Sequence, residues 1–141
     1  MEALIKEVLE KGYLLSLATL DEKGIWASEV VYTFDEKFNI YWISKITARH
    51  SQAIIQHPQI AGVITISNKP EEKDFGLQIA GTAEKLEGIP SVATAYWQKL
   101  GNPSRASKLS EDSSWYCLKP KRIELTHQQL FGYTKKILEL N

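Results

Sequence analysis

The feature that most constrains the fold is a series of short apolar runs, rich in strand-forming residues and separated by polar turns. Three such runs follow one another early in the chain: Tyr13–Leu20, Ile25–Phe34 and Phe38–Ser44. The segments between them, 21–24 and 35–37, contain the Asp, Glu, Lys and Gly residues that favour turns. This pattern predicts a meander of three consecutive β-strands.

Four more strands are expected further along. The segment Ile60–Ile66 is almost continuously apolar and β-branched, which predicts a strand covered on both faces. In 75–86, apolar and small or polar residues alternate, so that one face belongs to the core and Gln78 lies on the other. Gly81, like Gly76, lies inside this strand, where glycine marks a bulge, a barrel corner or the close approach of a ligand. The last two predicted strands are Trp115–Leu118 and Ile123–Thr126, separated by Lys119-Pro120-Lys121.

Two amphipathic helices are predicted, at 2–11 and at Pro90–Leu100. The serine-rich segment 102–114 has no periodicity and is expected to form a surface loop with at most one helical turn, which is a candidate lid. A last stretch, 130–140, completes the chain. Six or seven strands with two or three intervening helices predict a mainly β fold, a small antiparallel barrel with helices packed outside.

Composition narrows the classes of function. A length of 141 residues predicts one domain spanning 1–141. Lys plus Arg and Asp plus Glu both total 17, so the chain lacks the basic excess that drives nucleic-acid binding. The single Cys117 allows no internal disulfide and the three histidines are scattered, so no metal site is expected and a reducing cytoplasm fits. The N-terminal segment predicts neither a signal peptide nor a membrane span.

Basic residues cluster where a strand passes into a helix. With Thr47 as the N-cap, Arg49 and His50 fall in the first helical turn, beside Lys45. The positive end of the helix dipole disfavours cations by about 0.3–1 kcal/mol each, so the cluster is best explained by a bound anion. Free helix-start amides with Lys and Arg suit a phosphate. The alternative interpretation is an ordinary cap with solvated charges.

The order of these parts resembles the pyridoxamine 5'-phosphate oxidase-like FMN-binding split barrels. In that superfamily an apolar strand ending in Ser or Thr leads to a basic pair and then to Asn-Pro, and here the corresponding residues are Ser44, Arg49-His50 and His57-Pro58. The segment 76–88, which includes Gly-Leu-Gln-Ile-Ala-Gly, and the segment Phe131–Lys136 are similar to a small bacterial branch of the superfamily. The resemblance spans nearly the whole chain.

The resemblance implies a set of cofactor-binding residues. Arg49 and His50 match the phosphate-binding pair, although His50 departs from the usual Lys. The other implied contacts are the hydroxyl residue Ser44, the loop residues Lys45 and Thr47, Val30 and Val31 in the strand 27–32 that borders the flavin ring, Gln78 as a hydrogen-bonding partner of the ring or ribityl chain, and Trp115 across a dimer interface. For Val30, Val31 and Trp115 the alternative is plain packing, and an exposed strand Gln needs no function.

The resemblance also implies a cofactor and an assembly: FMN, bound between the subunits of a homodimer. The Arg-x-His segment that holds substrate phosphate in true pyridoxamine phosphate oxidases is not reproduced at 133–136, so vitamin B6 oxidation is not expected. The chain therefore resembles a flavin-dependent oxidoreductase acting on a small molecule, with NADH or NADPH as an electron donor admitted by the 102–114 loop through Arg105 and Lys108. Those two cations are alternatively solvated loop charges. The rival functions are a non-enzymatic carrier of flavin, heme or a related cofactor and, more weakly, a module that binds a nucleic acid or protein partner.

Overall fold

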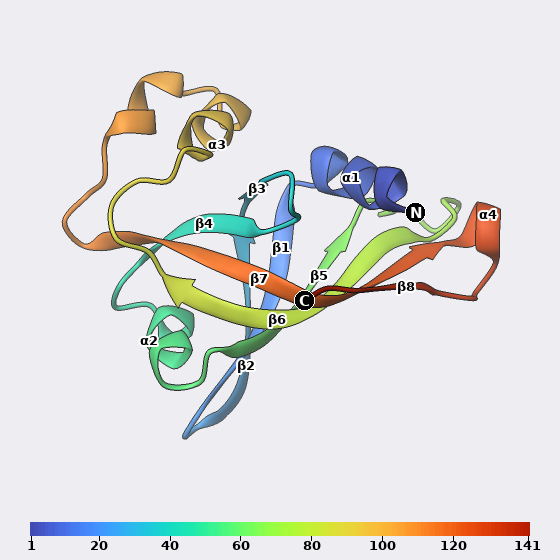
Figure 1. Ribbon diagram of the computed structural model, residues 1–141, viewed down its shortest axis with the longest axis horizontal. Helices are drawn as coiled ribbons and strands as arrows, with labels where there is room; N and C mark the ends of the chain where they lie inside the picture. The colour runs from blue at the N-terminus through green and yellow to red at the C-terminus, as the bar shows by residue number, and fades with distance from the viewer.

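The computed structural model describes all 141 residues, which form one curled antiparallel sheet with helices around it (Figure 1). The helices are α1 (Glu2–Lys11), α2 (Arg49–Gln56), α3 (Ala93–Lys99), α4 (Gln128–Phe131) and the 3₁₀ helix η1 (Pro103–Ser107). The strands are β1 (Leu14–Asp21), β2 (Gly24–Val31), β3 (Thr33–Phe34), β4 (Ile40–Lys45), β5 (Gln59–Thr65), β6 (Phe75–Lys85), β7 (Ser113–His127) and β8 (Lys136–Glu139). The mainly β barrel with outer helices predicted from the sequence is confirmed.

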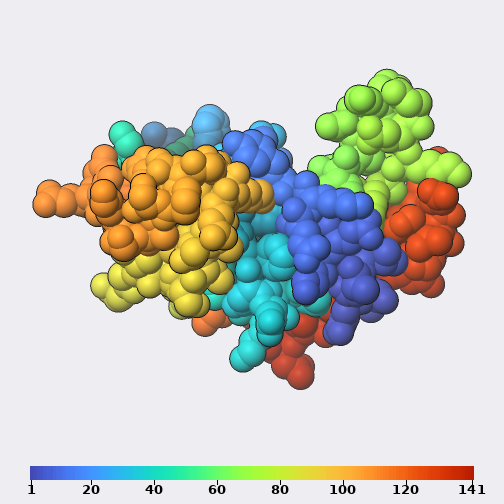
Figure 2. Space-filling view, turned by 90° about the horizontal axis from the view of Figure 1, so that it is seen from above, coloured from blue at the N-terminus to red at the C-terminus, as the bar shows by residue number.

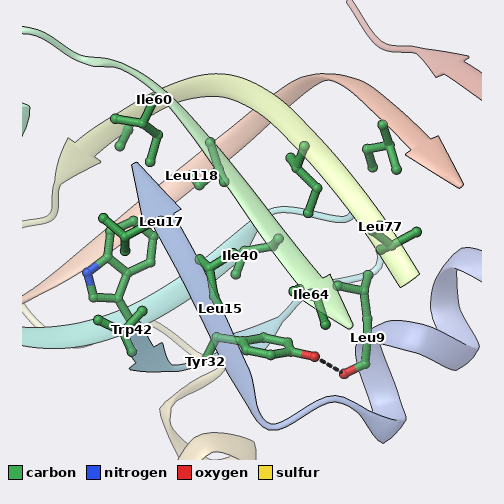
Figure 3. Packing of buried hydrophobic residues seen from close by; sticks show 14 of the residues in the cluster. Leu9, Leu15, Leu17, Tyr32, Ile40, Trp42, Ile60, Ile64, Leu77 and Leu118 are labelled. Atoms are coloured by element: carbon green, nitrogen blue, oxygen red, sulfur yellow. Dashed lines mark hydrogen bonds between the residues drawn. The ribbon is translucent and has the colours of Figure 1, made fainter. Parts of the chain in front are cut away.

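The strand order in the sheet is β2-β1-β5-β6-β7-β4-β3, and β8 pairs with β7. The predicted three-stranded meander is only partly right: β1 pairs with β2, and β3 at the end of the predicted second strand pairs with β4, but β2 itself does not pair with β4, which instead pairs with β7. The chain leaves β2 at Tyr32, whose fully buried ring donates its hydroxyl hydrogen to the Leu9 carbonyl oxygen at 2.8 Å (Figure 3). This break sends the next two strands to the other end of the sheet.

The two predicted strands near the C-terminus form a single strand, β7. One edge of β7 pairs with β6, and the other edge is shared by β4 over 113–118 and β8 over 122–125. Pro120 lies opposite Gly81, where the register shifts, and between the segments that pair with β4 and β8. Because no ladder bond is needed there, proline is tolerated inside the strand. Of the three alternatives given for Gly81, the register shift supports the bulge. A Cβ at this position would lie 2.1 Å from the Lys119 carbonyl oxygen, which explains the glycine.

Large apolar side chains fill the concave side of the sheet (Figure 3). The core comprises 19 buried residues, among them Leu15, Leu17, Ile64 and Leu77, and α1 closes it with Ile5, Val8 and Leu9. A smaller cluster of Ala93, Tyr96 and Trp115 lies under α3. In Figure 2 the α3 and η1 segments, gold to orange, form a lobe at the end of the molecule opposite α4.

The strand β5 differs from the sequence prediction. Its residues alternate between exposed and buried, so the strand is covered on one face and not on both. Val63 on the open face is 41% exposed. The structure has no helix long and apolar enough to cross a membrane.

Candidate functional site

The start of α2 has no side-chain cap. Its N-cap residue is Ala48, so the prediction that Thr47 caps the helix is wrong: Thr47 is exposed one residue earlier. The Gln52 amide donates to the Ala48 carbonyl at 3.0 Å, and helix geometry leaves the amides of residues 49–51 without an acceptor in the helix. The first turn also contains no acidic residue. These free amides are suited to an anion.

Arg49, the first residue of α2, is held by the β1–β2 turn. Its Nε donates to Asp21 Oδ2 at 2.8 Å and its Nη2 donates to Asp21 Oδ1 at 3.0 Å. The guanidinium carbon also lies 4.4 Å from the centre of the Trp26 ring. The hydrogen bonds from Arg49 lower the pKa of the Asp21 carboxyl below its ordinary value, so this carboxylate is ionised at neutral pH.

Two of the residues that the resemblance assigns to cofactor binding, His50 and Ser44, lie in contact. His50 Nε2 lies 2.8 Å from Ser44 Oγ, and burial lowers the pKa of the imidazole below its ordinary value of 6.5. His50 is therefore mostly neutral at pH 7. Next to it, the Ser51 side chain is 1% exposed and its Oγ has no hydrogen-bond partner. The sequence analysis did not identify Ser51, because a serine inside a helix carries no local signal of this kind.

Lys45 forms an ion pair outside the start of α2, with Asp112. Its Nζ lies 3.8 Å from Asp112 Oδ2, and both side chains are exposed. The neighbouring Ile46 amide donates to the Asp112 carbonyl at 2.9 Å, which joins the loop before α2 to the end of the 102–114 segment. That segment contains the helix η1, in which the exposed Arg105 lies 4.6 Å from the Trp97 ring centre. Lys108 follows η1 and is exposed.

Two of the predicted contact residues, Val30 and Trp115, are buried, and a third, Val31, is partly buried. Val30 is 8% exposed and is part of the main core, whereas Val31 is half-buried against the cluster under α3. Trp115 has no exposed surface, and its ring lies 5.0 Å from that of Tyr96 at 75°. These side chains therefore serve packing within the chain, and what β2 offers a ligand is its unpaired edge.

Gln78 lies on the convex face of the sheet, away from Arg49. Strand register puts Trp26, the residue that stacks on Arg49, on the opposite face of β2 from Ala27. Gln78 instead borders a groove of about 510 Å³ on the convex face, where its Oε1 accepts a hydrogen bond from Lys135 Nζ. One chain thus does not bring Gln78 and Arg49 together.

The floor of this groove is made of small side chains. Register aligns four alanines across four neighbouring strands: Ala27, Ala18, Ala61 and Ala80. Beside this alanine row the β1–β2 hairpin exposes larger apolar groups, with Leu20 at 46% and Ile25 at 79%. We refer to this surface, from β2 across to β6, as the outer face.

The residues at the start of α2 fit a phosphate group. They supply the free amides of 49–51 and the Arg49 guanidinium. The net positive charge is small, because Arg49 is paired with Asp21 and His50 is mostly neutral. No group of three or more His, Cys, Asp or Glu side chains lies close enough to hold a metal ion.

The chain matches known proteins along most of its length. A family model described as pyridoxamine 5'-phosphate oxidase matches residues 1–127. A UPF0306 protein of Yersinia pseudotuberculosis is 24% identical over 135 residues, which is 95% of this chain and 89% of the relative. A second UPF0306 protein, from Yersinia pestis, gives the same values.

Solved structures share the fold. A putative pyridoxamine 5'-phosphate oxidase from Listeria innocua has a TM-score of 0.72 and 18% identity, with 88% of this chain and 96% of that chain covered. The heme storage protein HutZ from Vibrio cholerae has a TM-score of 0.70 and 18% identity, with 98% and 93% covered. A heme-binding protein from Mycobacterium smegmatis has a TM-score of 0.75 and 20% identity; 98% of this chain is covered, but the chain spans only 56% of that protein.

Proposed function

Since the chain belongs to the pyridoxamine 5'-phosphate oxidase family, we propose that it binds FMN, with the flavin phosphate at the start of α2. The observation that carries this proposal is the uncapped first turn of α2, whose free amides lie at the same helix end as the Arg49 guanidinium. Free amides at a helix start are normally satisfied by a capping side chain, water or a ligand, and no side chain of this chain caps α2. A phosphate supplies acceptor oxygens for all of these donors.

Each residue has a defined task in this proposal. Arg49 donates charge-assisted hydrogen bonds to the phosphate, and the amides of 49–51 complete its contacts. His50, oriented by Ser44, contributes a donor or acceptor according to its tautomer. The unpaired edge of β2 over 27–31 borders the ring, and the bound flavin supplies the redox chemistry while the protein orients it.

The assembly that completes the site is a homodimer through the outer face. The alanine row allows close approach of a second sheet, and Leu20, Ile25 and Val63 would lose exposed apolar surface on pairing. Because Gln78 lies on the outer face, it reaches the flavin held by Arg49 of a second copy, not that of its own chain. The site is therefore shared between two subunits.

The activity we propose is a flavin-dependent oxidoreductase that acts on a small molecule other than pyridoxamine phosphate. NADH or NADPH supplies the electrons, and the 102–114 segment, joined to the loop before α2 at Asp112, borders its entrance. Arg105 and Lys108 are the exposed cations of that segment, and they attract the phosphates of the donor.

A cofactor carrier is the second candidate. The observation that favours it is the likeness to structures titled as heme-binding and heme storage proteins, which share the fold with this chain. In that case heme replaces FMN, and the histidines are the first residues to test as ligands of its iron.

The absorption spectrum of the purified protein separates these functions. A yellow protein that releases FMN on denaturation supports the proposal, whereas a Soret band with no flavin favours heme. For the flavin-loaded protein, NADH or NADPH is then added anaerobically and bleaching of the flavin band is followed. Fast bleaching that slows when Arg105 and Lys108 are both changed to Ala supports an oxidoreductase. If only dithionite reduces the flavin, the protein is a carrier.

A further inference from the structure

The Arg49 guanidinium is fixed by two groups that lie outside α2. Asp21 accepts hydrogen bonds from Nε and Nη2 along one side of the group, and the guanidinium carbon lies over the Trp26 ring, 4.4 Å from its centre. An arginine side chain has several rotatable bonds, and it loses their freedom when it binds a ligand. Here that ordering takes place on folding, since a bidentate pair and a ring contact restrain the guanidinium plane in different directions.

The donors that remain are those at the end of the guanidinium. The group has five N–H donors, and Asp21 accepts from Nε–H and from one N–H of Nη2. Both N–H groups of Nη1 and the second N–H of Nη2 have no protein acceptor among the hydrogen bonds of Arg49. This end edge matches two oxygens of a phosphate. A carboxylate that competed with phosphate would occupy the end edge, and Asp21 does not.

We propose that Asp21 and Trp26 are positioning residues, which hold the Arg49 guanidinium ready to bind the flavin phosphate. This inference rests on the proposed function and adds to it the reason why FMN is preferred to riboflavin. Pre-ordering raises affinity by reducing the ordering cost of binding. Asp21 leaves free the edge of the guanidinium that the phosphate uses, and we expect the gain from pre-ordering to exceed the repulsion between the two anions.

The first variant is Asp21→Asn. Asn retains Oδ1, which accepts from the Lys23 amide at 2.9 Å and keeps the turn, but its Nδ2 cannot accept from Arg49 Nε. FMN affinity is expected to fall about tenfold, with riboflavin affinity unchanged. The matched control is Glu22→Gln, which removes one charge from the same turn without breaking a bond to Arg49. This control is expected to leave FMN affinity unchanged or to raise it slightly.

Trp26 gives a second pair of variants. Trp26→Leu removes the aromatic face and is expected to lower FMN affinity about threefold, whereas Trp26→Phe keeps a face and restores most of it. A higher FMN affinity in Asp21→Asn would show that the carboxylate competes with the phosphate, and it would overturn the proposal. Equal losses for FMN and riboflavin would overturn it too.

A flavin-independent readout separates this inference from the proposed function. In the ¹H–¹⁵N spectrum of the flavin-free protein, the Arg49 Nε–H signal, assigned by its loss in Arg49→Lys, is expected to be sharp and to broaden in Asp21→Asn. If FMN binds neither protein, the proposed function fails. The role of Asp21 is then read with inorganic pyrophosphate: weaker binding by Asp21→Asn supports positioning, and equal or tighter binding overturns it.

Discussion

The two faces of the sheet carry different kinds of side chain and have different roles in the molecule. The concave face carries Leu15, Leu17 and Ile64, each 0–1% exposed, and it determines how the strands curl around the core. On the outer face the same strands carry Ser16, Ala18 and Ala61, with Leu20 and Ile25 at the hairpin. The first face stabilises the chain, whereas the second, with its alanine row and exposed hairpin residues, is the surface at which we propose that a second copy binds.

The largest expected effect is at the concave face. Leu17→Ala should lower the free energy of unfolding by about 2–5 kcal/mol, because it removes buried apolar atoms and leaves a cavity. Leu20→Ala makes the same chemical change on the outer face of the same strand. At concentrations where the chain is monomeric it should cost less than about 1 kcal/mol. Urea unfolding followed by tryptophan fluorescence measures both, and equal losses would remove the distinction between the faces.

The next effect concerns the outer face. Ala61→Glu places a charge in the middle of the alanine row, so the dissociation constant of the proposed dimer should rise at least about tenfold, or 1.4 kcal/mol. Monomer stability should hardly change, since Ala61 is exposed in the single chain. Gln98→Glu adds the same charge on α3 as a control. Sedimentation velocity at micromolar concentration decides: a dimer that survives Ala61→Glu unchanged would mean that another surface pairs.

The smallest effect lies at the start of α2. Because burial lowers the pKa of His50 in the folded chain, the unfolded chain binds more protons below pH 6.5, and stability falls as the pH drops through this value toward the folded pKa. Flavin-free His50→Gln should lose less stability between pH 7 and pH 5 than the parent. Urea midpoints at both pH values test this. An equal loss in the two proteins would assign the pH dependence to other groups.

The concave face was predictable because it follows a local rule. The alternation around Gln78 places Leu77 and Ile79 inside, as the structure has them. The stripe of 2–11 likewise gives α1. Strand pairing was harder to predict from the sequence, because the position of Pro120 inside β7 and the break at Tyr32 depend on partners that are distant in sequence. A local pattern therefore predicts that a strand or helix forms more reliably than it predicts which elements pack or pair with it.

The candidate site divides in the same way. Arg49 and His50 were identified from a strand-to-helix junction and Ser44 from the family resemblance, and two of them, His50 and Ser44, are in direct contact. Asp21 was not identified, because it is 28 residues from Arg49 and looked like an ordinary turn residue. The alanine row could not be predicted from the sequence either, because it forms only when four strands pair in the correct register.

The central claim is that the start of α2 holds the phosphate of FMN, and Arg49→Ala tests it most directly. The dissociation constants of FMN and riboflavin are measured by flavin fluorescence quenching for the parent and the variant, with thermal unfolding to confirm the fold. A charge-assisted hydrogen bond contributes about 1.5–3 kcal/mol, so FMN affinity should fall at least tenfold while riboflavin affinity stays the same. Equal losses for FMN and riboflavin would contradict the account.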